Sequence, residues 1–465
     1  MMFSKRLGML LVAIVTLCGM TTSQALADAV YTWGDNWFGQ LGDGTTIWRN
    51  LPVALTGQMS SGVTTIAGGS QHSLVIKDGC VWAWGYNSNG QLGSGSTSNR
   101  STPAALTGQM SSGVTAITGG DLHSLALKGG GVWAWGSNGN GQLGDGTKTD
   151  RLSPVALTGQ MSSGVTAIAG KGSHNIALKN GGVWAWGNNY YGQLGDGTTT
   201  YRNSPVALTG EMSSDVTVIA AGTFHSLALK NGGVWAWGDN YYSQLGDETM
   251  TQCNSPIALT GEMSSGVTAI AAGQGHSLAI KDGHVWAWGS SSDGQLGNGT
   301  KGGSSATPIQ IAPNNLYNMV AIAASCWSSY ALSADGSLWA WGNNSYYQMG
   351  VGTYGGYYTT PQHLLPPAGY RFTSITTGDY HVLATVAPVQ TNCAGQPGDF
   401  NGDCKVDETD ISILFSCFTE PEDLVTSPCQ ATDMNNDGMV DMVDFAILQR
   451  CLAPYASLLN PNCAD

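Results

Sequence analysis

Charged residues are scarce in this sequence: Asp, Glu, Lys and Arg together make up only 10% of its 465 residues. So low a share excludes a surface of long charged helices and favours short polar turns. Basic residues are the scarcer kind, with 17 Lys and Arg against 31 Asp and Glu. We therefore expect no cationic surface for nucleic acid. No stretch after the N-terminus approaches the roughly 20 apolar residues of a membrane span, so none is expected.

The first residues have the pattern of an export signal. A basic pair precedes an apolar run over residues 7–20, and small residues at 25–27 form a cleavage site. The run is too short for a membrane helix. We expect a signal peptide at residues 1–27, a mature chain beginning at Asp28, and a protein that is secreted or held at the envelope of a bacterium.

Cysteine is rare before residue 392 and common after it. Three scattered cysteines, Cys80, Cys253 and Cys326, follow the one in the signal, and six more lie in the last 73 residues. An exported chain meets an oxidising compartment, so disulfides are expected mainly in this C-terminal region. Their pairing stays open, as does whether the three scattered thiols bond, remain free or link chains.

One unit recurs seven times along the chain. A Trp-Gly pair marks each copy, at intervals of 51 residues and finally 53, and its tryptophans are Trp33, Trp84, Trp135, Trp186, Trp237, Trp288 and Trp341. A period near fifty with four short strand patterns per copy is typical of a propeller blade. The fold class predicted is mainly β, with a seven-bladed β-propeller at residues 28–386.

Four strands can be read in the copy between residues 114 and 157. The first covers residues 114–117, the second 123–127 and the third 132–135, and the fourth begins at Pro154, where an edge tolerates proline. The chain starts with third and fourth strands and ends with first and second ones. We therefore predict that the N-terminal and C-terminal half-blades pair and close the ring.

The repeats resemble a known family over residues 30–386. They read VWAWG, then GQLGDGT, then AAG followed after two residues by HSLALK, and the seventh Gln-Leu-Gly departs to Gln348-Met349-Gly350. This is similar to the regulator of chromosome condensation repeat. The resemblance implies a propeller that binds other proteins. The namesake's nuclear exchange activity does not fit an export signal, and secreted bacterial propellers, including β-lactamase inhibitory ones, compare better.

Six of the eight histidines share one repeat position, where the sixth copy has Ser328; they are His72, His123, His174, His225, His276 and His381. Metal binding and a local hydrogen bond at the start of the second strand are the alternatives. The hydrogen bond is favoured, because no carboxylates or thiolates accompany the ring. His284 and His363 form no acid–base or nucleophile pattern, so we expect no enzyme and no catalytic residue.

The positions where the repeats disagree are candidates for binding, because exposed aromatic loops on a rigid ring are typical of recognition surfaces. Thirteen of the 16 tryptophans fit blade packing, and Trp48 is one of the three left over. The predicted ligand-binding residues are Trp37, Phe38, Tyr190, Tyr191, Tyr241, Tyr242, Tyr346, Tyr347, Phe224, Trp327 and Tyr380. Drift in solvent-exposed turns is the alternative, and the two stay open here.

After a linker at residues 387–397, two acidic loops follow, 34 residues apart. Each carries oxygen-bearing residues at positions 1, 3, 5, 9 and 12 and offers a carbonyl at position 7, the arrangement that calcium requires. The predicted ligands are Asp399, Asn401, Asp403, Lys405, Asp407, Asp410, Asp433, Asn435, Asp437, Met439, Asp441 and Asp444. Apolar residues at helical spacing follow each loop, so we predict a small α-helical domain that binds two calcium ions in EF-hand-like loops.

A duplicated loop with Asp at position 12 and a single following helix resembles the dockerin module, here at residues 398–455 before a tail at 456–465. The resemblance implies attachment to a cohesin-type scaffold. Cys404 replaces the usual glycine at position 6 of the first loop, while Gly438 keeps it in the second. Arg450 alone remains of the basic residues of the helix.

These observations predict a secreted, monomeric, non-catalytic adaptor. The propeller would recognise a protein or a glycan, and the dockerin-like module would attach it to a scaffold or cell surface. The alternatives are a lectin-like envelope protein or an accessory component of a polysaccharide-degrading assembly, with a hydrolase as a third.

Overall fold

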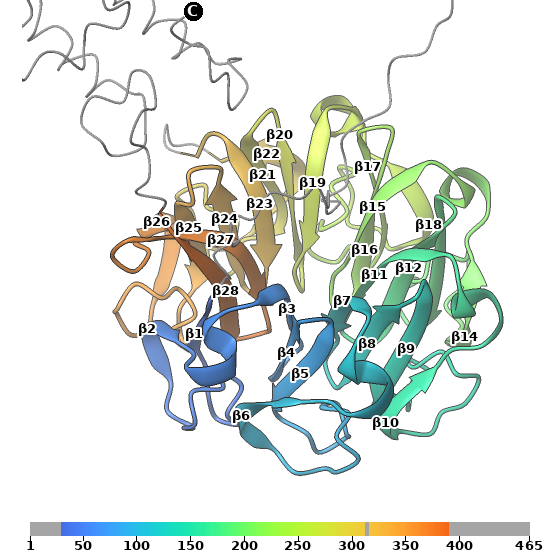
Figure 1. Ribbon diagram of the computed structural model, residues 1–465. Coiled ribbons are helices and arrows are strands. Elements are labelled where there is room, and N and C mark those ends of the chain that lie inside the picture. Colours follow the sequence, from blue (N-terminus) through green and yellow to red (C-terminus); the bar gives the residue numbers. More distant parts are fainter. Residues whose placement is uncertain (1–28, 312–315, 390–465) are drawn as a thin grey trace, which may run out of the picture. The chain divides into compact units, whose positions relative to one another are not determined.

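Seven four-stranded antiparallel sheets stand around a central axis in the computed structural model of the chain, as predicted (Figure 1). The structure describes residues 29–311 and 316–389. In six of the sheets the four strands are consecutive in the chain, so these blades are simple meanders, and the seventh combines strands from both ends of the described chain. We number the blades I to VII, blade VII being the one that contains both ends of the described chain.

The strands of the first four blades are nearly equal in length. Blade I contains β3 (Val63–Gly68), β4 (His72–Lys77), β5 (Cys80–Gly85) and β6 (Arg100–Ala105). Blade II contains β7 (Val114–Gly119), β8 (His123–Lys128), β9 (Gly131–Gly136) and β10 (Arg151–Ala156). Blade III contains β11 (Val165–Lys171), β12 (His174–Lys179), β13 (Gly182–Gly187) and β14 (Arg202–Ala207). Blade IV contains β15 (Val216–Ala221), β16 (His225–Lys230), β17 (Gly233–Gly238) and β18 (Cys253–Ala258).

The remaining blades include the closure. Blade V contains β19 (Val267–Ala272), β20 (His276–Lys281), β21 (His284–Ser290) and β22 (Ser304–Gln310). Blade VI contains β23 (Met319–Ala324), β24 (Ser328–Ser333), β25 (Leu338–Asn343) and β26 (Tyr357–Leu364). Blade VII contains β27 (Tyr370–Thr377), β28 (His381–Pro388), β1 (Ala29–Gly34) and β2 (Arg49–Ala54). Short 3-10 turns precede five blades: η1 (Gly57–Ser60), η2 (Gly108–Ser111), η3 (Gly159–Ser162), η4 (Gly210–Ser213) and η5 (Gly261–Ser264).

The predicted closure is confirmed. Strand β1 pairs antiparallel with β28, from Ala29 opposite Val386 to Gly34 opposite His381. The two ends of the propeller thus share one sheet, and neither of these strands is left with a free edge. The first and last strands of the ring, coloured blue and orange, lie side by side in Figure 1.

Blades pack through a bulky face against a small one. In blade II the face with Leu125 and Leu127 meets Ala177 and Trp186 of blade III. Each Trp-Gly tryptophan is fully buried, and its indole N–H donates to the backbone carbonyl of the loop glutamine of the preceding blade, as Trp84 does to Gln40 over 2.8 Å. Packing between blades therefore accounts for this repeated tryptophan, as the sequence predicted.

The repeated histidines also join blades, so the expectation of a local hydrogen bond is wrong. Each Nε2 pairs over 2.8–3.0 Å with a Ser or Asn of the neighbouring blade; the pairs are His72–Ser124, His123–Asn175, His174–Ser226, His225–Ser277, His276–Ser329 and His381–Ser73. The Ser73 hydroxyl donates its proton to the Gln40 carbonyl, so Nε2 of His381 must be the donor to Ser73.

Close glycine contacts fix the position of these rings. A Cβ on Gly69 would lie 2.4 Å from Nδ1 of His72, so the chain needs glycine at that position. Burial lowers the pKa of His72 to about 3 and that of His123 to about 4, so the imidazoles are neutral near pH 7.

One junction, between blades VI and VII, lacks this link. Ser328 stands where the other blades have histidine, and Val382 stands where its partner would be. Tyr330 of blade VI supplies a replacement donor: its hydroxyl bonds the Gln348 carbonyl over 2.8 Å, the same carbonyl that accepts from Trp33. Elsewhere a serine or asparagine of the following blade makes that second bond.

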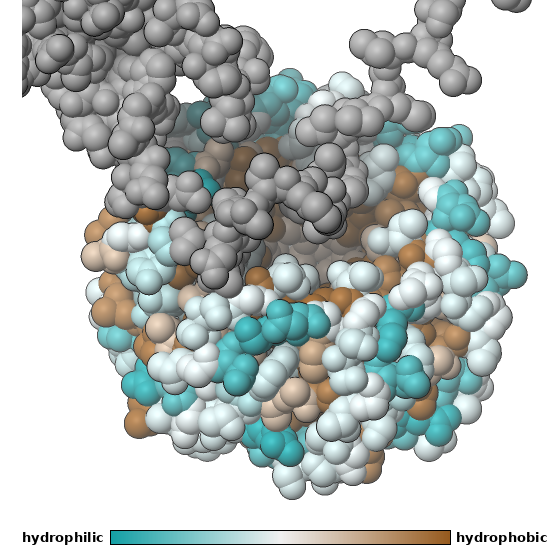
Figure 2. All heavy atoms as spheres, viewed as in Figure 1, coloured by the Kyte–Doolittle hydropathy of each residue, from teal (hydrophilic) through white to brown (hydrophobic). Residues whose placement is uncertain are grey.

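The expected signal peptide at residues 1–27, most of the linker, the module at 398–455 and the tail at 456–465 lie outside the described residues. The chain divides after Ala387 into two units, and the described residues belong almost entirely to the first. Among the residues that the structure describes, no helix has the length and apolar character to span a bilayer. Seen from the face in Figure 2, apolar residues gather around the centre of the ring.

Candidate functional site

The two sets of divergent positions predicted from sequence lie next to each other on one face. The turn between a blade's first and second strands and the loop between its third and fourth lie at the same end of the strands, because the strands alternate in direction. A backbone hydrogen bond joins the two in every blade, as from Asp239 N to the Phe224 carbonyl over 3.0 Å. We call this end of the propeller the loop face.

One group of predicted residues forms a packed aromatic cluster, which we call the seam. Its ring contacts run from Trp327 through Tyr380, Tyr346 and Trp48 to Tyr347, with centroids 4.5–6.1 Å apart, and Tyr354 continues the series at 5.0 Å. The seam joins blades VI and VII, where the histidine link is absent. Its rings cover one another, so blade packing explains much of what the sequence analysis assigned to ligand binding.

A second group of four rings has two that are exposed to solvent. Tyr191 and Phe224 meet at 5.4 Å, and Tyr241 and Tyr242 at 4.9 Å, all four around blade IV. Tyr241 remains 67% exposed and Tyr242 43% exposed. Tyr190 stands edge-on against Tyr191 at the rim of this group.

These four side chains line a pocket of about 460 Å³ together with residues that the sequence analysis did not single out. The additional lining residues are Asp239, Met250, Gln252 and Gln274. We call this the blade IV pocket. Its volume lies within the range of small-ligand sites, and it contains polar groups beside aromatic walls, as such sites do.

Trp37 and Phe38 belong to neither group. Trp37 is 68% exposed, and Phe38 packs against Tyr86 of the neighbouring blade with ring centroids 4.5 Å apart. The structure thus divides the predicted surface into a packed seam, an open pocket and a separate pair.

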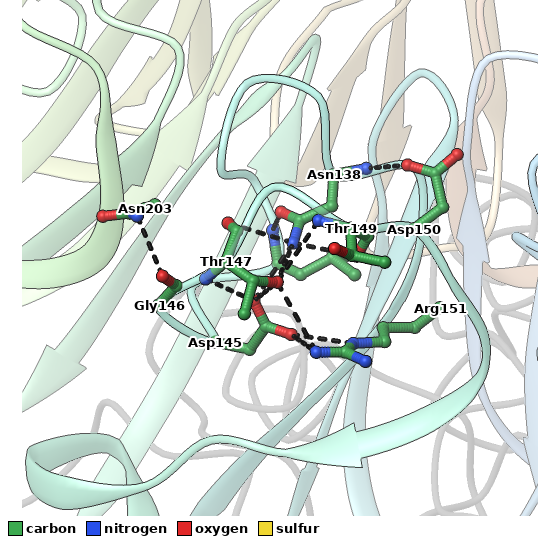
Figure 3. A network of polar contacts seen from close by, with 9 residues as sticks. Asn138, Asp145, Gly146, Thr147, Thr149, Asp150, Arg151 and Asn203 are labelled. Carbon is green, nitrogen blue, oxygen red and sulfur yellow. Dashed lines mark hydrogen bonds and ion pairs between the residues drawn. The ribbon is translucent and has the colours of Figure 1, made fainter.

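The rim loop of blade II shows how three of the rim loops are held (Figure 3). Asp145 accepts from Thr147 and forms an ion pair with Arg151 at 2.7 Å, while Asn138 donates to Asp145 and to the Thr147 and Thr149 carbonyls. Blades III and VII repeat this network, with the pairs Arg202–Asp196 and Arg49–Asp43. A short polar loop is thereby fixed from within.

The rim loop of blade IV departs from that arrangement. Cys253 takes the place of the arginine opposite the conserved Gly238, so Asp247 has no guanidinium beside it within the loop. Ser243 and Glu248 occupy positions that are glycine in most copies, and both have left-handed backbones with φ of 60° and 67°. A side chain in that region costs roughly 1–2 kcal/mol per residue. This strained loop carries Tyr241 and Tyr242.

The centre of the ring is a cavity of about 280 Å³ with a polar mouth. Lys171 ends β11 and reaches across the channel, where its Nζ donates to the carbonyls of Ala324 at 2.6 Å and Ala272 at 3.3 Å. Burial, and then the charge of Asp379, raises the pKa of Asp121 to about 7, while Lys171 opposes the shift. Sequence reasoning missed Lys171, although it stands where five copies have glycine.

The titratable groups of the channel and the blade IV pocket are few. Ser70 donates to Asp379 at the mouth, and burial raises the pKa of the Cys326 thiol well above its usual range. The blade IV pocket has one carboxylate and no histidine, cysteine or serine among its lining residues. Among residues 29–311 and 316–389, no three His, Cys, Asp or Glu side chains are grouped to hold a metal. The calcium ligands predicted between Asp399 and Asp444 lie outside the described residues.

Comparison with protein families agrees with the fold. The model of the RCC1-like domain matches residues 159–400, about half of the chain, and the regulator of chromosome condensation repeat matches residues 28–76, 78–127 and 129–178. The chain belongs to the RCC1-like domain family. The dockerin type I domain matches residues 397–453, which places a second recognised module after the RCC1-like propeller.

Curated relatives cover most of the RCC1-like region. The RCC1 domain-containing protein RUG3, mitochondrial, of Arabidopsis thaliana is 30% identical over 77% of this chain and 88% of its own length. The ultraviolet-B receptor UVR8 of the same plant is 28% identical over 73% of this chain and 79% of its own length. The human E3 ubiquitin-protein ligase HERC2 is 28% identical over 78% of this chain, which spans only 8% of that ligase.

Solved structures show the same fold. Prp20p from Saccharomyces cerevisiae, whose structure is described with its binding to Gsp1p and histones, covers 83% of this chain and 96% of its own with a TM-score of 0.71 at 22% identity. Human WBSCR16 covers 78% and 99% with a TM-score of 0.70 at 24% identity. At such identities the likeness concerns the fold alone.

Proposed function

We propose that this protein is a secreted, non-catalytic adaptor whose RCC1-like propeller binds a ligand on its loop face and whose dockerin-type module attaches it to a cohesin-type scaffold. The observation that carries the proposal is the pairing, in one chain, of an RCC1-like propeller with a dockerin type I match at residues 397–453. A binding ring joined to an attachment module makes an adaptor without any need for chemistry of its own.

The properties of the loop face support the binding half. Open aromatic side chains surround the blade IV pocket, and that pocket has neither a nucleophile nor an imidazole among its lining residues. Large aromatic side chains contribute much of the binding energy at recognition surfaces. The alternating oxygen ligands of the two acidic loops support the attachment half, since calcium ordering of these loops would create the scaffold-binding surface.

The remaining parts of the proposal follow from the sequence. Residues 1–27 serve as the signal peptide, 387–397 as the linker and 398–455 as the module, and the protein acts as a monomer at the cell surface or outside a bacterium. Two calcium ions are bound, one per acidic loop. An accessory role in polysaccharide breakdown is compatible with this arrangement.

Capture of the full-length protein on an immobilised type I cohesin tests the attachment half. Binding is expected in millimolar calcium and lost in EDTA, because weak extracellular calcium sites empty readily. Asp399→Asn combined with Asp433→Asn should abolish capture. Lys405→Ala is the matched control, since position 7 of the loop uses only the backbone carbonyl. Capture that is indifferent to calcium, or absent with it, would reject this half of the proposal.

A further inference from the structure

We propose that the blade IV pocket binds a neutral pyranose residue of a glycan, by ring stacking on its tyrosines and hydroxyl recognition by its carboxylate and amides. This inference rests on the proposed function of the loop face and names the ligand class for it.

Two of the aromatic walls of the pocket, Tyr241 and Tyr242, are exposed. Their rings are arranged edge to face, as are those of Tyr191 and Phe224, so each pair turns one ring edge toward the other and keeps ring surface for an incoming ligand. In the seam, Tyr346 and Tyr380 are tilted at 42° with centroids 4.5 Å apart, and both are partly buried. The apolar face of a pyranose, formed by C–H groups, needs flat exposed rings of the first kind.

The polar groups of the pocket suit hydroxyls rather than an anion. Asp239 can accept from a hydroxyl, and the amides of Gln252 and Gln274 can both donate and accept. No lysine, arginine or histidine lines the pocket, so an anionic ligand would lack a counter-charge. The Asp239 carboxylate is already oriented by bonds from Tyr241 N and Gln244 Nε2, at 3.2 and 2.8 Å. Such a set of one fixed acceptor and two amides matches an uncharged polyhydroxyl ligand.

Blade IV and its neighbour both differ from most other copies where they border this pocket. Gly275 of blade V occupies the position of Phe224, Trp327 and Tyr380 in other copies, and a Cβ there would lie 2.9 Å from the Tyr242 ring. A larger side chain at residue 275 would displace Tyr242. On the same loop the usual glycines are replaced by Ser243 and Glu248 with left-handed backbones. Strained residues of this kind gather at functional sites.

The loop carries its lining residues in the stretch where blades II, III and VII have an Arg–Asp ion pair. Cys253 stands in place of the arginine, and the residues just before it are the exposed Met250 and Gln252, both of which line the pocket. In blade II the same stretch contains Thr149 and Arg151, which close the loop on itself. Blade IV thus lacks this ion pair and has in the same stretch two side chains that face a cavity.

Calorimetric titration of the full-length protein with cellohexaose, xylohexaose and mannohexaose, three neutral probes of different stereochemistry, tests the inference. At least one should bind, and Tyr241→Ala and Tyr191→Ala should each weaken binding about tenfold or more, as loss of a stacking anchor does. Tyr241→Phe keeps the ring and should bind within about threefold of the unmodified protein. Tyr201→Ala is the matched control, an exposed tyrosine of the blade III loop outside the pocket.

Each result supports or overturns the inference. Binding that Tyr241→Ala weakens about tenfold or more and Tyr201→Ala leaves unchanged supports it. Absence of binding by all three hexaoses, or binding that Tyr241→Ala leaves unchanged, overturns it. Tyrosine-dependent binding of decaproline in place of the sugars would also overturn it, while preserving the loop face as a recognition surface. Cohesin capture of the same preparations reports on the adaptor proposal separately, because it depends on the acidic loops and not on Tyr241.

Discussion

Six of the seven blade junctions share one hydrogen-bonded link, and the seventh junction lacks it. At six of them a buried histidine donates to a serine or asparagine of the next blade, and at the junction of blades VI and VII Ser328 and Val382 remove both members of the pair. There Tyr330 replaces the lost donor, and the aromatic seam covers the loop face above it. A repeated ring thus tolerates the loss of one polar link when a buried hydroxyl and packed rings take its place.

This difference also separates two kinds of aromatic residue that look alike in sequence. Trp327 and Tyr380 contact each other across the exceptional junction, whereas Tyr241 and Tyr191 border a pocket at an ordinary one. A histidine link makes aromatic packing unnecessary for holding blades III to V together. Their exposed rings are therefore free to serve a ligand.

Removing the closing strands should have the largest effect. Deletion of residues 372–386 takes away most of β27 and of β28, including every residue of β28 that pairs with β1, which leaves β1 without its inner partner. We expect loss of the cooperative thermal transition, measured by circular dichroism. Truncation after Val389 keeps all seven blades and should retain the transition. Equal melting temperatures for the deletion and the unmodified protein would show that the ring does not depend on its closure.

Acid should act on the six linked junctions together. Burial lowers the pKa of His174, His225 and His276 to about 3, against a usual value of 6.5, so the unfolded chain binds more protons below pH 6.5. Stability is therefore lost as the pH falls from 6.5 toward 3, by up to about 1.4 kcal/mol per pH unit for each histidine. The free energy of unfolding of a typical protein is about 5–15 kcal/mol, so six such histidines predict cooperative acid unfolding near pH 5. Tryptophan fluorescence measured during an acid titration would detect this transition.

Two carboxyls work in the opposite direction without changing that outcome. Burial, and then the charge of Asp379, raises the pKa of Asp121 to about 7, so this group stabilises the folded state as the pH falls from 7 toward 4. Burial also raises the pKa of Asp35, but two carboxyls oppose six histidines and cannot balance them. His276→Gln keeps an N–H for Ser329 and removes one titrating group, so its unfolding midpoint should move to lower pH. Full thermal stability at pH 4 would contradict the prediction.

The exceptional junction predicts a smaller effect. Tyr330→Phe removes the hydroxyl that donates to the Gln348 carbonyl and should lower the free energy of unfolding by about 1–2 kcal/mol. Val382→Ser in the same protein places a serine where the other blades have theirs and should restore part of the loss. Urea unfolding of the single and double variants measures both. An unchanged midpoint for Tyr330→Phe would mean that the seam alone holds this junction.

Periodicity gave the ring, the four strands per blade and the closure, because each copy carries its own turn residues and alternation. The Asp78-Gly79 turn, for example, has the left-handed angles of 52° and 72° that a tight hairpin requires. Contacts between copies could not be read in the same way. That His72 bonds Ser124, 52 residues on, depends on how adjacent blades face each other.

The candidate site was predicted only in part, because features within one repeat can be read from the sequence and contacts between repeats cannot. Divergence among the repeats pointed to Tyr191, Phe224, Tyr241 and Tyr242, since neighbouring loops of one blade stay together in any propeller. Asp239 and Gln274 were missed, because they join the pocket only through the geometry between blades. Cys253 in place of an arginine was the available signal, and its meaning appears only beside the ion pairs of blades II and III.

Restoring that arginine should have the smallest effect and bears directly on what distinguishes blade IV. Cys253→Arg places a guanidinium opposite Asp247, as Arg202 stands beside Asp196 at 2.6 Å in blade III. Partly exposed pairs contribute little, so we expect a gain of up to about 1 kcal/mol in the free energy of unfolding, measured in urea. Arg202→Cys makes the reverse exchange and should cost a similar amount. Slower amide exchange across residues 241–252 in Cys253→Arg would show that the lack of an Arg–Asp ion pair leaves the pocket loop more mobile. Equal exchange in the variant and the unmodified protein would mean that the internal bonds of Asn240 and Thr249 already hold the loop.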